Sequence, residues 1–163
     1  AHEPLRLNEL IDDVADLYEP TAAEAGLQLI VSCAEAVDVV GDGGRIRQVI
    51  ANLIDNAIKY TTAPGRVDLS LSTESGQAVV EVRDTGIGIH PDDLPHVFER
   101  FYRADRARTK QGSSGTGLGL AICSSIITAH GGELRLTSEL GTGSVATITL
   151  PRFELAETGS GGG

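Results

Sequence analysis

The chain has 163 residues, 40% of them hydrophobic and 4% aromatic, with a formal net charge of −10 at pH 7. This length and hydrophobic content suit one domain with a single core. The negative charge argues against general nucleic-acid binding, and no apolar run reaches the length of a membrane span or forms a signal peptide.

Because Met is absent, also at position 1, we expect a piece of a longer or processed protein. The piece itself is expected to be soluble, monomeric and cytoplasmic, and membrane anchoring of its parent stays an open alternative. Cys33 and Cys123 lie within apolar sequence and lack metal-ligand spacing. This favours buried, reduced thiols in a reducing compartment.

The N-terminal part is predicted to be the end of a linker, residues 1–4, followed by one amphipathic helix. Apolar residues recur at helical spacing from Leu7 to about Ala25. Pro20 is expected to kink or split this helix, and Gly26 to end it. The expected buried side consists of Leu10, Ile11, Val14, Leu17, Tyr18, Ala22 and Ala25.

The predicted strands come as three consecutive pairs, each joined by a turn. They are Leu27–Cys33 with Val37–Val40, Val67–Ser72 with Ala78–Arg83, and Glu133–Ser138 with Ser144–Leu150. Because strands come largely as hairpins and are mixed with helices, the pattern favours an α+β two-layer sandwich over a doubly wound parallel sheet.

A second helix, Gly41–Thr61, has two unlike faces, and Asp42 can cap its start. Its polar face holds Asn52 and Asn56 four residues apart, and Asn is a poor helix former. Such amides suit a hard cation with phosphate oxygens, while the alternative is a surface helix that happens to hold two Asn. The apolar stripe consists of Ile46, Val49, Ile50, Leu53, Ile54, Ala57 and Ile58.

A glycine turn, Asp84-Thr85-Gly86-Ile87-Gly88-Ile89, directly follows a predicted strand. Glycines let the backbone turn sharply and approach a ligand closely. Asp84 is placed to accept a hydrogen bond, for which an adenine amino group is one donor. The alternative is a plain strand-to-loop turn.

Residues 84–116 are mostly polar, with a short helix expected near Asp92–Phe98. Between Glu99 and Lys110 the local charge is +3, whereas the remainder of the chain carries −13. A local polyanion site and a solvated loop both fit this charge. The segment Phe98-Glu99-Arg100-Phe101-Tyr102-Arg103 is interpreted either as a lid that reaches phosphate or as a small pinned helix.

A glycine-rich segment, residues 112–120, leads into a predicted helix, Leu118–His130, that Gly131-Gly132 ends. Backbone N–H groups at a helix start favour phosphates, while the alternative is a flexible linker. No Walker sequence and no Ser-type kinase catalytic loop is present. The expected buried side of the helix consists of Leu118, Ile122, Ile126 and Ala129.

Taken in order, N-x3-N, D-x-G-x-G, F-E-R-F-Y-R and G-T-G-L-G-L resemble the ATP-binding catalytic domain of sensor histidine kinases. These kinases share a superfamily with type II topoisomerase, heat-shock chaperone and mismatch-repair ATPases. The resemblance covers about Pro4 to Pro151. It implies a mixed sheet of about five strands, covered on one face by three helices, with a mobile ATP lid. Residues 1–153 would form this domain and 154–163 a disordered tail.

The resemblance also implies roles for single residues. Asn52 and Asn56 would coordinate Mg²⁺ that bridges the ATP phosphates, and Lys59 would approach phosphate, so these three form the expected catalytic set. Tyr60 would pack beside the adenine or ribose.

The remaining expected nucleotide-binding residues follow in the other three motifs. Asp84 would bind the adenine amino group, with Gly86 and Gly88 beside it. The others are Ile89, Phe98, Phe101, Tyr102, Arg103, Gly115, Thr116, Gly117, Leu118 and Gly119.

Two departures refine the resemblance. The ATPase cousins carry a Glu about one turn before the metal-binding Asn, where this chain has Asn52. An amide cannot accept a proton at neutral pH, which favours phosphoryl transfer to an imidazole over hydrolysis. The acceptor His of such kinases lies on a preceding dimerisation hairpin, and His2, His90, His96 and His130 all lie outside that context. His130 is interpreted as structural.

The expected partners are therefore a dimerisation and phosphoacceptor domain and, beyond it, a response regulator, with no nucleic acid. One alternative is an anti-sigma-factor Ser/Thr kinase of the same superfamily, from which F-E-R-F-Y-R points away. Another is a nucleotide-sensing module without catalysis, which the intact motifs disfavour.

Overall fold

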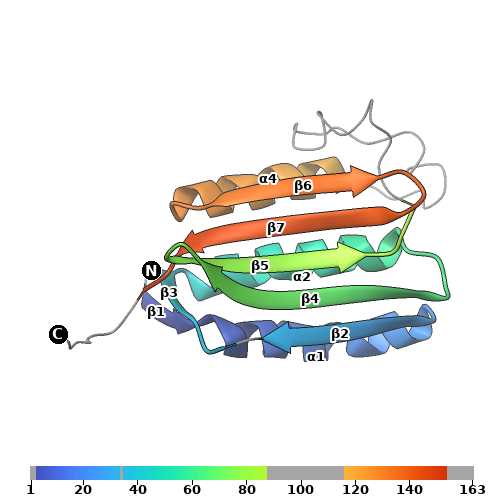
Figure 1. Cartoon of the computed structure of the whole chain (residues 1–163), viewed down its shortest axis with the longest axis horizontal. Coiled ribbons are helices and arrows are strands. Elements are labelled where there is room, and N and C mark those ends of the chain that lie inside the picture. Colours follow the sequence, from blue (N-terminus) through green and yellow to red (C-terminus); the bar gives the residue numbers. More distant parts are fainter. Residues whose placement is uncertain (1–2, 34, 88–115, 154–163) are drawn as a thin grey trace.

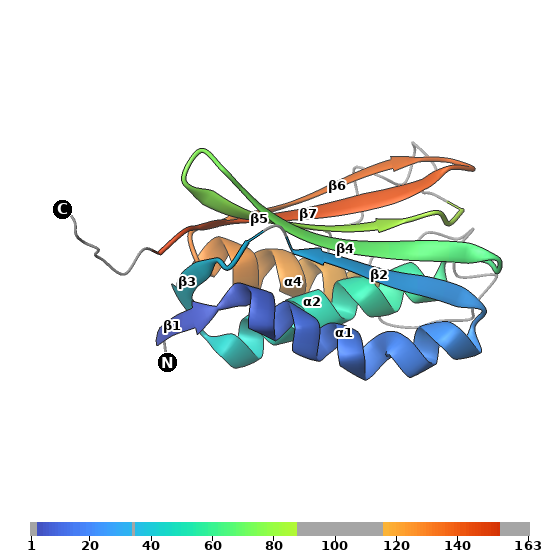
Figure 2. The ribbon, with the colours of Figure 1, turned by 60° about the horizontal axis from the view of Figure 1, so that its bottom comes forward.

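A five-stranded mixed sheet with three helices packed on one face forms the described body of the protein (Figures 1 and 2). The computed structural model describes residues 3–33, 35–87 and 116–153. The elements are β1 (Glu3–Arg6), α1 (Leu7–Glu24), β2 (Leu27–Cys33), β3 (Asp38–Gly41), α2 (Gly43–Lys59), β4 (Gly65–Glu74), β5 (Gln77–Asp84), α4 (Thr116–Ala129), β6 (Glu133–Glu139) and β7 (Gly143–Pro151).

The main sheet has the order β2-β4-β5-β7-β6, in which only the pair β2 and β4 is parallel among the described strands. Hairpins join β4 to β5 and β6 to β7. In the first hairpin Ser75 and Gly76 have φ of 53° and 78°, the left-handed conformations that a tight two-residue turn needs. The predicted α+β sandwich with a mixed five-stranded sheet is confirmed.

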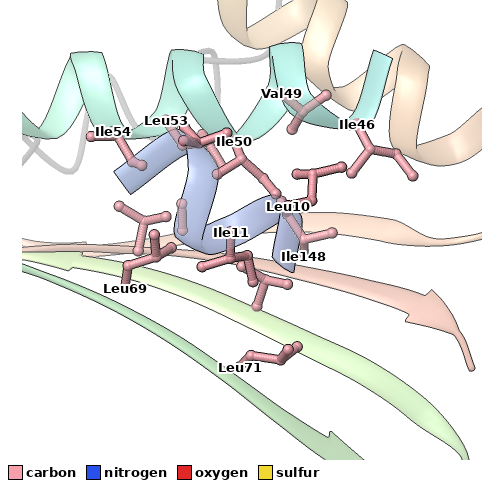
Figure 3. Close-up of a cluster of buried hydrophobic side chains, with 14 of the residues drawn as sticks. Leu10, Ile11, Ile46, Val49, Ile50, Leu53, Ile54, Leu69, Leu71 and Ile148 are labelled. Atoms are coloured by element: carbon pink, nitrogen blue, oxygen red, sulfur yellow. The ribbon is translucent and has the colours of Figure 1, made fainter. Parts of the chain in front are cut away.

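The core lies between the sheet and the helices, as Figure 3 shows. All seven apolar residues predicted for the second helix are buried on α2. They face Leu10 and Ile11 of α1, Leu69 and Leu71 of β4, and Ile148 of β7. Burial of one such side chain stabilises a fold by roughly 1.5–3 kcal/mol. The stripe on α2 therefore holds the helix firmly in one rotational setting.

The expected linker end at residues 1–4 is wrong, because β1 begins at Glu3 and pairs antiparallel with β3. This small second sheet also corrects the expected pairing of Val37–Val40 with Leu27–Cys33. Two hydrogen bonds hold the segment before β3 at the start of α1 and not beside β2. Leu7 N–H donates to the Val37 carbonyl (2.7 Å), and Val37 N–H donates to Asn8 Oδ1 (3.2 Å).

Of the two effects expected of Pro20, a kink or a split, the split does not occur, since α1 is continuous from Leu7 to Glu24. Pro20 lies on the exposed side, where water can bond the carbonyl that lacks a helical donor. The buried stripe is also narrower than expected, because Leu17 is 67% exposed and Ala25 is exposed. Gly26, with φ of 77°, follows the helix end as predicted.

Two expectations about the C-terminal helix and the cysteines also need correction. Ala129 is exposed and Ile122 is half-buried. From residue 120 onward, the residues that α4 buries are Leu120, Cys123, Ile126 and Ile127, and the side chain of Leu118 lies outside the described part. The buried sector differs because α4 packs against α2 as well as against the sheet. Both cysteines are free thiols, but only Cys123 is buried, whereas Cys33 is half-buried.

His130 joins the end of α4 to the start of α2. Its Nδ1 lies 2.8 Å from the Ile126 carbonyl, which can only accept, so Nδ1 carries the proton. Its Nε2 then accepts from the Asp42 N–H at 3.1 Å. The Asp42 side chain in turn caps α2 by accepting from the Arg45 N–H (3.2 Å), as predicted. These bonds need the neutral imidazole.

We predict that His130→Ala lowers the free energy of unfolding by about 1–3 kcal/mol, because it removes both backbone contacts of a half-buried ring. Urea denaturation measures this loss. The matched control is Thr128→Ala, an exposed position on the same helix. Equal losses in the two variants would contradict the assigned link.

Candidate functional site

The candidate site lies at the end of the molecule where α2 and β5 end and α4 begins, on the right in Figure 1. Six residues predicted for the nucleotide site lie on the described parts of α2 and β5 or directly after them. They are Asn52, Asn56, Lys59, Tyr60, Asp84 and Gly86.

The amide face of α2 is opposite to its buried stripe and is not fully covered. Asn52 and Asn56 are half-buried and lie one turn apart. Asn52 Nδ2 donates to the Cys123 thiol of α4 at 3.6 Å. Lys59 is exposed at the C-terminal end of the same helix, and its Nζ lies 3.2 Å from Asp55 Oδ2. The face therefore presents two neutral amides and, one turn on, an ammonium group.

Asp84 ends β5 with a partly desolvated carboxylate. Burial raises the pKa of Asp84, against the opposing effect of hydrogen bonds from the backbone N–H groups of Gly86 and Ser144. Both bonds, at 2.9 and 3.2 Å, go to Oδ1. Within the described part of the chain no hydrogen bond reaches Oδ2. That oxygen is thus suited to accept from a ligand's amino group.

The turn after β5 packs tightly against the end of α2. Ile87 N–H donates to the Tyr60 carbonyl at 3.1 Å. A side chain at Gly86 would overlap that carbonyl and lie 3.0 Å from the Thr61 Oγ1. Only glycine therefore lets the Asp84 turn approach the helix end. Gly143, the first residue of β7, is also restricted to glycine, because a Cβ there would overlap the Asp84 carbonyl.

Other expected site features lie outside the described residues. These are Gly88, Ile89, Phe98, Phe101, Tyr102, Arg103 and Gly115, the short helix Asp92–Phe98, the basic segment, the lid and the tail 154–163. Thr116, Gly117, Leu118 and Gly119 form the first turn of α4, as far as their backbone is described.

Sequence reasoning missed three residues that shape the site. Ser144 donates its backbone N–H to Asp84, Gly143 permits that approach, and Cys123 bonds to Asn52. Gly143 lies in the turn expected before Ser144–Leu150, but its closeness to Asp84 follows from the β5–β7 register, which pairs Asp84 with Ser144, 60 positions later. Nothing in the sequence around Cys123 indicates its partner.

Comparison with known proteins identifies the family of the chain. Residues 41–154 match the family model described as histidine kinase-, DNA gyrase B- and HSP90-like ATPase. The chain belongs to this ATPase family. It is 43% identical to the sensor histidine kinase RppB of Synechocystis over 150 residues, which are 91% of this chain and 33% of RppB. It is 39% identical to the Staphylococcus aureus sensor protein SrrB over 145 residues, 89% of this chain and 25% of SrrB.

Solved structures place the fold in the histidine kinase branch of the family. The nucleotide-free catalytic domain of histidine kinase ThkA superposes with a TM-score of 0.81 at 28% identity, covering 93% of this chain and 98% of that domain. Full-length ShkA in complex with AMPPNP superposes with a TM-score of 0.81 at 34% identity, covering 93% of this chain and 31% of ShkA.

The chain spans only a quarter to a third of the length of these curated relatives. Within the residues described, none of the helices is both long and apolar enough to cross a membrane.

We predict that Gly86→Ala destabilises this histidine kinase-type domain by about 1–3 kcal/mol, because its methyl group would overlap the Tyr60 carbonyl. Thermal unfolding measures the effect. Gly44→Ala, in the first turn of α2 with only ordinary contacts, is the control and should be neutral or stabilising. A Gly86→Ala protein as stable as this control would refute the packing argument.

We predict that Asp84→Asn stabilises the protein near pH 7. The folded-state pKa of Asp84 is raised above its ordinary value of about 4, so the folded protein binds this proton more tightly than the unfolded chain does. The stability that Asp84 contributes is therefore present below its ordinary pKa and is lost as pH rises through the raised pKa. The amide avoids this loss and keeps an oxygen for Gly86 and Ser144.

Urea unfolding between pH 4 and pH 8 provides the measurement. The stability difference between Asp84→Asn and wild type should shrink as pH falls. An exposed carboxylate on α1, replaced as Asp16→Asn, serves as the control. A difference that grows as pH falls would contradict the assigned burial effect.

Proposed function

We propose that this domain binds Mg-ATP and, within an intact sensor kinase, donates the γ-phosphoryl group to a His on an adjacent dimerisation domain. The phosphoryl group then passes to an Asp of a response regulator. The observation that carries the proposal is the joint placement of Asp84 and the α2 amides. The bond from Ile87 N–H to the Tyr60 carbonyl fixes the two groups relative to each other.

Asp84 accounts for recognition of the base. Its Oδ1 is engaged by two backbone donors, while Oδ2 is available to the exocyclic amino group of adenine. Guanine presents a carbonyl oxygen at the corresponding ring position and would meet the carboxylate with repulsion. A ligand that leaves a buried polar group of the site without a hydrogen-bond partner binds much more weakly than one that pairs with it. The domain is therefore expected to prefer ATP over GTP.

The amide face of α2 fits a hard cation held together with phosphate oxygens. Asn56 Oδ1 is a neutral oxygen ligand of the kind that Mg²⁺ takes beside phosphates, and Asn52 lies one turn before it. When bound, the cation would neutralise phosphate charge during transfer. Lys59 can leave its exposed pair with Asp55 at little energetic cost and approach a phosphate.

The same face favours transfer over hydrolysis. Asn52 stands where a water-activating carboxylate is needed for an ATPase, and its amide cannot take a proton. A neutral imidazole is already a nucleophile, so for transfer to His the domain needs only to position the phosphates and neutralise their charge. The relatives named as sensor kinases and the AMPPNP complex of ShkA support this proposal.

Isothermal titration calorimetry with ATP, ADP and GTP, each with and without Mg²⁺, tests the proposal. We expect ATP and ADP to bind a monomeric domain, Mg²⁺ to strengthen ATP binding, and GTP to bind far more weakly. Absence of binding by both adenine nucleotides would refute it.

We predict that Asn56→Ala weakens ATP binding at least about tenfold in the presence of Mg²⁺, since it removes a metal ligand. Without Mg²⁺ the variant and wild type should bind ATP alike. Gln48→Ala, an exposed amide two turns earlier on α2, is the matched control and should bind as wild type does. Unchanged Mg-ATP affinity of Asn56→Ala would overturn the metal role.

A further inference from the structure

We propose that Cys123 is a positioning residue for the nucleotide site: its buried thiol holds the carboxamide of Asn52 in one orientation. The inference rests on the function proposed above, because Asn52 is part of the amide face that would meet the phosphates. In this proposal a buried residue of α4 orients a polar side chain of α2.

The contact joins two helices at a place where their apolar packing meets the polar site. Cys123 is fully buried on α4, and Asn52 is half-buried on α2. Asn52 Nδ2 lies 3.6 Å from Cys123 Sγ, within the range of a hydrogen bond to sulfur. The neighbouring residues Ile126 and Ile127 of α4 are buried and apolar, so they offer no competing acceptor.

A carboxamide has a donor end and an acceptor end of nearly the same shape, so packing alone orients it poorly. The sulfur of Cys123 accepts from the NH₂ group, so Asn52 Oδ1 is the end of the carboxamide that does not bond to the thiol. Oδ1 is the atom that can serve a cation.

The contact also links the amide to the helix that begins at the glycine-rich segment. Cys123 lies seven residues, about two turns, after Thr116, where α4 starts. Anything that rotates or shifts this part of α4 therefore acts on the orientation of Asn52 as well.

The test compares Cys123→Val, which keeps a small apolar group but removes the acceptor, with Cys123→Ser, which restores an acceptor. Ile126→Val, another buried position on α4, controls for loss of packing. Two quantities are measured: the side-chain amide resonances of Asn52 by ¹H–¹⁵N NMR without nucleotide, and ATP affinity by calorimetry with and without Mg²⁺.

In Cys123→Val we expect shifted or exchange-broadened Asn52 amide resonances and a Mg-ATP affinity about three- to tenfold weaker, as loss of one neutral hydrogen bond gives. Affinity for ATP without Mg²⁺ should stay the same. Cys123→Ser should recover both the resonances and the Mg-dependent affinity, and Ile126→Val should change neither.

Unchanged resonances and unchanged Mg-ATP affinity in Cys123→Val would overturn the inference, as would equal effects in Ile126→Val. Failure of the wild-type domain to bind ATP is a separate outcome that refutes the proposed function. In that outcome the contact itself would still be read from the Asn52 resonances.

Discussion

The seven buried residues of α2 pack against α1, the sheet and α4, and this burial determines where the opposite face of the helix points. A helix held by so much apolar surface cannot rotate without exposing several of these side chains. The direction of Asn52 and Asn56 is thus a consequence of hydrophobic packing. The turn that carries Asp84 is then joined to the helix end through the Tyr60 carbonyl, so the core positions both halves of the site.

Asp84 differs from the α2 stripe, because its partly buried carboxylate lowers the stability of the fold near pH 7. Its carboxylate is drawn partly out of water at the strand end, and two backbone N–H groups of the described residues partly offset the lost hydration. An oxygen held in this way is poorly solvated before a ligand arrives and pairs well with a suitable donor. A more stable side chain at this position, such as Asn, would replace one of the two carboxylate oxygens and with it the proposed acceptor for adenine.

The periodic parts of the fold could be read from the sequence, whereas the contacts between distant segments could not. The α2 stripe, the β4–β5 and β6–β7 hairpins and the Asp42 cap depend on neighbours within a few residues, so local patterns predicted them. The β1–β3 pair was missed because it joins segments more than 30 residues apart, each only four residues long. A short edge strand that contains Pro leaves little local signal.

The same distinction holds within the candidate site. Asn56 and Asp84 could be predicted as candidates because each belongs to a motif with a fixed spacing and a chemical reason. Ser144 and Cys123 act through a register and a helix crossing that only the folded chain defines. The lid predicted for the polar stretch lies outside the described residues and stays a prediction.

The small β1–β3 sheet has a practical consequence for work with this domain. Glu3 pairs with Gly41, and Phe153 N–H donates to the Asp38 carbonyl, so the first and last described residues are both fastened to β3. In Figure 1 this corner lies at the opposite end of the sheet from the end of β5 and the start of α4. An affinity tag, a fluorophore or a surface linker attached beside Glu3 or Phe153 would thus start at the end of the sheet away from the candidate site, which suits immobilised binding assays.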